Sequence, residues 1–100
     1  MFTVQYIDRT PFHHEIIGLT AAAVVRLNAN YRNHRRTHAV FLTVEGNNIR
    51  YWINGQDPTI VQGHIVYATG NLYLNDPKAI RELRMISTGG NATVMVTYYR

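Results

Sequence analysis

The stretch Ile49–Leu74, IRYWINGQDPTIVQGHIVYATGNLYL, decides the fold class. It holds three short segments rich in the β-branched and aromatic side chains that strands favour, at residues 49–53, 64–67 and 72–74. Between them lie turn signals: Asn54 and Gly55 tolerate positive φ, Pro58 cannot donate to a strand ladder, and Gly70 turns the chain again. Short strands joined by turns predict antiparallel β structure.

Outside this stretch, further segments read as strands from alternation or from β-branched content. These are residues 2–7, 12–17, 38–45, 84–87 and 92–99. Residues 19–27 are ambiguous, because three alanines favour a helix while Val24 and Val25 favour a strand; consistency with a strand-rich chain favours the strand. Asn28–Thr37 has no apolar periodicity and is predicted to be a long loop.

One short helical turn is predicted after the organising stretch. Asp76 is a suitable N-cap and Pro77 a suitable first helical residue, so a turn of helix is expected over 78–83. The chain therefore predicts an all-β fold. It is a single antiparallel β-sandwich domain over residues 1–100, jelly-roll or immunoglobulin-like, with about eight short strands and at most one helical turn.

Composition removes several classes of protein. The chain has no cysteine, which excludes disulfides, thiolate nucleophiles and cysteine-based zinc sites. Its longest apolar run, residues 21–25, is far short of the ~20 residues that span a membrane, and its first residues predict no signal peptide. An apolar fraction of 46% with 16% charged residues is typical of a globular domain.

No catalytic or cofactor site is predicted. Ser87 is the single serine and lacks a nucleophile-elbow motif, and the six acidic residues are scattered. The adjacent His13 and His14 would point to opposite faces of a strand, so they cannot share a metal ion. The expectation is a protein that is not an enzyme and carries no metal or cofactor.

A basic cluster is the main candidate for partner binding. Its members are Arg26, Tyr31, Arg32, Arg35 and Arg36, and no acidic residue occurs from 28 to 37. Such a cluster fits an acidic patch on a protein lattice, a nucleic acid, or a solvated loop. A net charge of +4 and the lack of interleaved aromatic residues argue against nucleic acid. The protein-lattice and solvated-loop interpretations stand level.

Aromatic residues offer a second surface. Tyr51 with Trp52, and Tyr98 with Tyr99, are adjacent pairs that must place one ring on each side of a sheet. One ring of each pair is expected in the core, while the other is available to a protein interface or to a sugar.

The second half of the chain resembles small virion proteins encoded among the structural genes of tailed bacteriophages. The shared pattern comprises Ile49-Arg50-Tyr51, Asn54-Gly55-x-Asp57-Pro58-Thr59, Gly63-His64, Gly70, Leu83-Arg84-Met85-Ile86 and Ala92-Thr93-Val94-x-Val96-Thr97-Tyr98-Tyr99. The chain departs from it at Asn54, where the pattern has Asp, and in the length of its arginine-rich segment.

The resemblance implies a non-enzymatic structural protein of the virion, assembled in the host bacterial cytoplasm. Such a protein would bind the capsid or tail lattice as a decoration or adaptor protein, contact other virion proteins and self-associate in multiple copies, with no nucleic-acid or membrane partner. The alternative from another class is a small β-barrel module that binds nucleic acid or glycan. Binding that weakens steeply with salt would favour that module.

Overall fold

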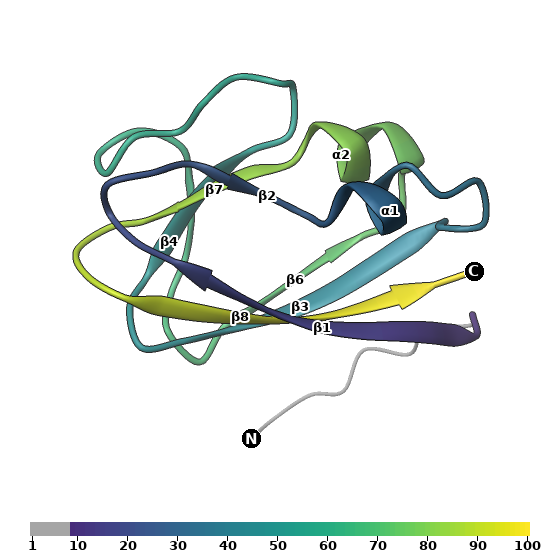
Figure 1. Ribbon diagram of the computed structural model, residues 1–100. Helices are drawn as coiled ribbons and strands as arrows, with labels where there is room; N and C mark the ends of the chain where they lie inside the picture. The colour runs from purple at the N-terminus through teal and green to yellow at the C-terminus, as the bar shows by residue number, and fades with distance from the viewer. Residues whose placement is uncertain (1–8) are drawn as a thin grey trace.

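A computed structural model describes residues 9–100, which form eight strands and two short helices (Figure 1). The strand predicted at residues 2–7 lies outside the described residues. The elements are β1 (Pro11–Leu19), β2 (Val25–Arg26), α1 (Ala29–Arg32), β3 (Ala39–Glu45), β4 (Ile49–Trp52), β5 (His64–Val66), β6 (Asn71–Leu74), α2 (Pro77–Glu82), β7 (Arg84–Ser87) and β8 (Ala92–Tyr99).

The strands form two antiparallel four-stranded sheets. Sheet A has the order β1-β8-β3-β6, and sheet B has the order β2-β7-β4-β5. The first strand thus pairs with the eighth, the second with the seventh, the third with the sixth and the fourth with the fifth. This is the pairing of one long hairpin wound into two layers, which is the topology of a jelly roll. The predicted β-sandwich is confirmed.

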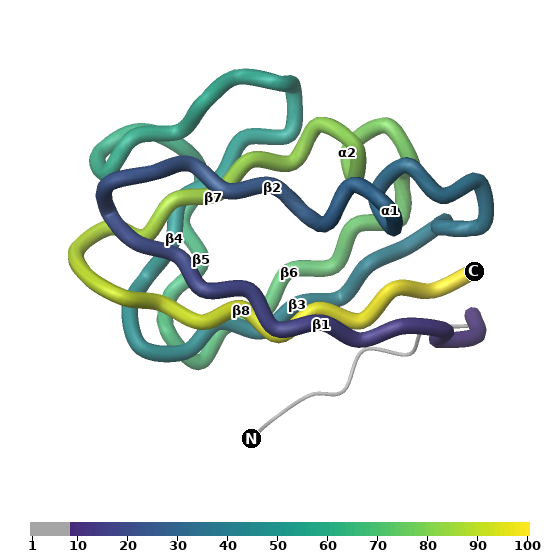
Figure 2. Tube along the Cα trace, in the orientation of Figure 1, coloured from purple at the N-terminus to yellow at the C-terminus, as the bar shows by residue number. Residues whose placement is uncertain are grey.

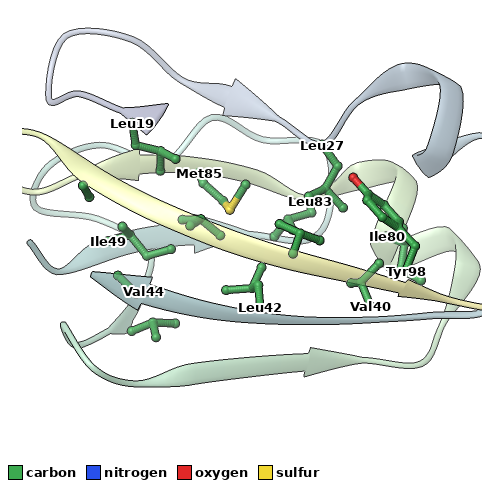
Figure 3. Packing of buried hydrophobic residues seen from close by; sticks show 14 residues of the cluster. Leu19, Leu27, Val40, Leu42, Val44, Ile49, Ile80, Leu83, Met85 and Tyr98 are labelled. Atoms are coloured by element: carbon green, nitrogen blue, oxygen red, sulfur yellow. The ribbon is translucent and has the colours of Figure 1, made fainter. Parts of the chain in front are cut away.

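The core lies between the two sheets and follows the alternation of the strands. In β8, Val94, Val96 and Tyr98 point inward and are almost fully buried, whereas the residues between them point away from sheet B. Leu42 from β3 and Met85 from β7 meet them from the two layers (Figure 3). Inward and outward residues therefore alternate along β8 with a period of two, as a sandwich requires.

The stretch that decides the fold contributes to both layers. β4 and β5 pair in sheet B, with Ile49 opposite Val66. The chain then crosses at Thr69, a non-glycine residue with φ of 70°, and enters sheet A as β6 (Figure 2). The predicted antiparallel structure is confirmed for all three segments, although the third pairs with β3 and not with its neighbours in the stretch. The positive φ expected at Gly55 is confirmed, at 81°.

Two predictions between β1 and β3 were wrong. Residues 20–24 bend from sheet A to sheet B, so of the predicted strand 19–27 only Leu19, the last residue of β1, and Val25–Arg26 are in strands. The predicted loop 28–37 contains helix α1, because the Asn28 side chain accepts a hydrogen bond from the Asn30 backbone N–H at 2.9 Å and caps the turn.

Helix α2 matches its sequence signals. The Asp76 side chain accepts a hydrogen bond from the Lys78 backbone N–H at 3.1 Å, and Pro77 occupies the first helical position. Ala79 and Ile80 are buried, so the helix closes one end of the sandwich (Figure 3). Neither helix is long enough to cross a membrane, within the part of the chain that the structure describes.

Candidate interaction surfaces

The structure divides the predicted basic cluster into two groups. Arg26 and Arg32 are half-buried and bond to the backbone: Arg26 donates to the carbonyl of Arg81 near the end of α2, and Arg32 donates to the carbonyl of Leu27. A cation near the last carbonyls of a helix also interacts favourably with the helix dipole. These two arginines therefore help to hold α1 and α2 in place, whatever else they bind.

The other predicted cations lie at one end of sheet A. Arg35 and Arg36 are exposed in the turn that follows α1. Arg9 and Arg100 lie at the same end, since the backbone of residue 100 bonds to that of Thr10 in both directions, and His38 donates to the carbonyl of Tyr99. The two chain segments 9–10 and 99–100 thus bring two more arginines to the end where Arg35 and Arg36 lie. Only fold topology reveals this positive end.

Tyr31 belongs to an aromatic cluster rather than to an open surface. Its ring stacks on the ring of His13, with centroids 3.7 Å apart and planes 9° apart. The ring centroid of Tyr98 lies 5.3 Å from that of Tyr31, and the ring centroid of Phe12 lies 6.5 Å from that of each tyrosine. The Tyr31 ring therefore joins α1 to β1 and β8, and little of it is free for a partner.

The innermost member of this cluster is held by a carboxylate. The Tyr98 hydroxyl donates to Glu15 on β1, and Glu15 also accepts from the Asn28 backbone N–H. Burial, and next the hydrogen bond to Glu15 and its negative charge, raise the pKa of Tyr98 well above its ordinary value of 10.0. Burial also raises the pKa of Tyr51.

These shifts predict a loss of stability at high pH. The unfolded chain loses the Tyr98 proton near pH 10, while the folded chain keeps it, so the free energy of unfolding should be unaffected below pH 10. Above pH 10, ionisation of Tyr98 in the unfolded chain should lower the free energy of unfolding by up to ~1.4 kcal/mol per pH unit. Urea denaturation at pH 9, 10 and 11 measures this, with Tyr98→Phe as the control. An equal decline in that variant would assign the effect to other groups.

The outer face of sheet A is a broad surface without charge at its centre. Two rows of directly opposed side chains cross all four strands. The rows are His14, Thr97, Phe41 and Tyr73, and Ile16, Met95, Thr43 and Asn71. Ile16 is 71% exposed and its neighbour Met95 is 42% exposed. Aromatic and methionine side chains without charged residues are typical of the centre of a protein interface.

A second exposed apolar surface is the tip of the β4–β5 loop, residues 53–63. Ile60 is 47% exposed and Val61 is 72% exposed. The loop is nevertheless well anchored, because Arg50 donates to the carbonyls of Ile60 and Gly63 at 3.2 and 2.8 Å, and Asp57 forms an ion pair with Arg84 at 2.7 Å. The loop therefore folds back over the outer face of sheet B.

The one serine of the chain is not open to a substrate. Ser87 is fully buried at the end of β7, as expected of a strand end. No group of three His, Asp or Glu residues lies close enough to hold a metal ion in this part of the chain. Comparison with protein-family models, curated proteins and solved structures finds no match to the chain.

Proposed function

We propose that this chain is a structural protein of a bacteriophage virion, without enzymatic activity, that docks on a protein lattice through the outer face of sheet A. The observation that carries the proposal is the uncharged centre of that face, built by the two rows around Ile16 and Phe41. Ile16 and Met95 are exposed neighbours on this face, and contiguous exposed apolar side chains mark interaction sites on protein surfaces.

The topology supports this role by analogy. Jelly rolls recur in viral capsid proteins, although the fold also serves lectins and many other functions. The sequence pattern that resembles phage virion proteins maps largely onto β4, β7, β8 and the turns around β5, and of these elements only β8 also contributes to the docking face, through Thr97 and Met95. The resemblance therefore supports the β-sandwich fold and a role in a virion, whereas the outer face of sheet A is the surface proposed to contact the lattice.

Repetition of the contact suits a decoration or adaptor role. A four-stranded face without central charge can bind many identical sites, because each contact needs no precise ion pair. Copies placed side by side on a lattice would also cover the edges of the sheets, which are otherwise open to pairing. Many weak contacts then sum to firm attachment.

The test is cosedimentation of the purified protein with empty capsids of the phage that encodes it. Ile16→Asp should weaken binding at least about tenfold, since it places a charge on an exposed apolar side chain of the contact. Val61→Asp makes the same chemical change on the β4–β5 loop and should bind as the unmodified protein does. Equal binding by the Ile16 variant, or no binding by the unmodified protein, would contradict the proposal.

A nucleic-acid-binding module is the second candidate, and the positive end of sheet A favours it. Arg35 and Arg36 are exposed there, beside the backbone of residues 10 and 100. Against it, Arg26 and Arg32 are already bonded to backbone carbonyls, and Tyr31 is stacked on His13. Binding of single-stranded DNA that falls steeply with salt and is abolished by Arg35→Ala with Arg36→Ala would support this candidate.

A further inference from the structure

The structure assigns an oxyanion site to Arg26, Arg32 and Arg84, and we propose that its ligand is a carboxylate of a protein partner. This site lies on the sheet B side of the sandwich and does not depend on the docking face of sheet A.

Register places two of the cations side by side. Arg26 of β2 lies directly opposite Arg84 of β7, and both point away from the core, because their neighbours Val25 and Met85 pack inward. Like charges directly opposite each other on paired strands destabilise a sheet. Arg32 joins them from α1: burial, and next the positive charge of Arg26, lower its pKa, and the charge of Arg84 adds to this effect.

Hydrogen bonding leaves the same part of each guanidinium unused. Each of the three arginines donates through one terminal nitrogen. Arg26 donates to the carbonyl of Arg81 and Arg32 to the carbonyl of Leu27, while Arg84 donates to Oδ1 of Asp57. The Nε–H group of each is buried and has no acceptor within the described residues. Buried donors without partners are costly and uncommon, and three in one cluster call for an acceptor.

The local charge indicates that the acceptor for these Nε–H groups is an anion. Asp57 is the one carboxylate bonded to any of the three arginines in residues 9–100. A bound oxyanion would offset the repulsion and accept from the free Nε–H groups, since a guanidinium donates two parallel bonds to a carboxylate or phosphate. The Arg84 side chain is 29% exposed, so a ligand can enter from its open edge and turn the guanidiniums toward itself.

Asp57 favours a carboxylate over a phosphate as the natural ligand. Its Oδ1 lies 2.7 Å from Nη1 of Arg84, which shows that a carboxylate fits the edge of this site. Asp57 is itself 62% exposed, so it lies at the entrance and competes with any incoming anion. Removal of its charge should therefore tighten ligand binding, an effect that a purely structural role for the arginines does not produce.

The experiment is calorimetric titration of the full chain with a hexaglutamate peptide, and separately with a single-stranded oligothymidylate of equal charge. Arg84→Lys and Arg26→Lys keep the charge but lose Nε, and each should weaken peptide binding at least about tenfold. Asp57→Asn should tighten it several-fold. The matched controls Arg35→Lys and Arg36→Lys should bind as the unmodified chain does.

Three results would overturn the site. They are no peptide binding, equal losses in the control variants, and tighter binding of the oligothymidylate than of the peptide. Circular dichroism of each variant checks the fold, because Arg26 also bonds to the end of α2. If Arg26→Lys unfolds, Arg84→Lys and Asp57→Asn decide the question, since the side chains of Arg84 and Asp57 bond to each other and not to the Arg81 carbonyl.

Discussion

Replacement of Tyr98 by alanine is expected to lower the free energy of unfolding by about 3–5 kcal/mol, because it empties the space of a fully buried aromatic ring. Tyr98 packs against Tyr31 and Phe12, and its hydroxyl bonds to Glu15, so the loss reaches β1, β8 and α1 together. A domain of this size has a total stability of about 5–15 kcal/mol. Chemical denaturation followed by circular dichroism measures the change.

Tyr98→Phe separates the ring from the hydroxyl. This variant keeps the packing and removes the stronger of the two hydrogen bonds to the Glu15 carboxylate, so it should cost about 1–3 kcal/mol. The alanine variant should therefore lose clearly more than the phenylalanine variant. If the two variants had the same stability, the ring would contribute nothing, and the aromatic cluster would not be part of the core.

Leu42→Ala is expected to cost about 2–5 kcal/mol. Leu42 lies on β3, at the centre of sheet A, opposite Val96 on one side and Leu72 on the other, and its side chain is fully buried. A cavity here cannot be filled by water without loss, since the neighbours are apolar. Thermal and urea denaturation should both report the loss.

The adjacent residue Thr43 is the matched control for Leu42. It points to the outer face of sheet A, between Met95 and Asn71, so Thr43→Ala should change stability by less than about 0.5 kcal/mol. A larger loss of stability from Thr43→Ala than from Leu42→Ala would mean that Thr43 points inward and Leu42 points outward on β3. It would then also remove the basis for the docking face.

Local signals predicted much of the framework. The alternation in 92–99 corresponds to β8, the alternation in 38–45 to β3, and Asp76 with Pro77 correctly marked the start of α2. Helix α1 was missed because four residues are too few to show a helical period; the capping role of Asn28 was its only local signal. Strand order was beyond local reasoning, since β1 pairs with β8 across most of the chain.

The same limit applies to the candidate surfaces. Arg26 and Arg32 were correctly placed near each other, but their bonds to Arg81 and Leu27 depend on how α2 and β2 pack. Sequence reasoning missed the outer face of sheet A entirely. Its residues come from four strands, and only their register aligns Ile16 with Met95. Alternation can assign a residue to a face of its own strand, but not to neighbours on other strands.

The winding of the sandwich has a consequence for biosynthesis. Of the eight strands in residues 9–100, β8 is the last to leave the ribosome, yet it lies in the middle of sheet A, between β1 and β3. Until β8 emerges, the edge strand β1 has no partner in its sheet, and β3 can pair only with β6. The nascent chain must therefore keep β1 unpaired in its sheet until β8 has left the ribosome, so the sandwich can close only after that point, and chaperones have most opportunity to act before it.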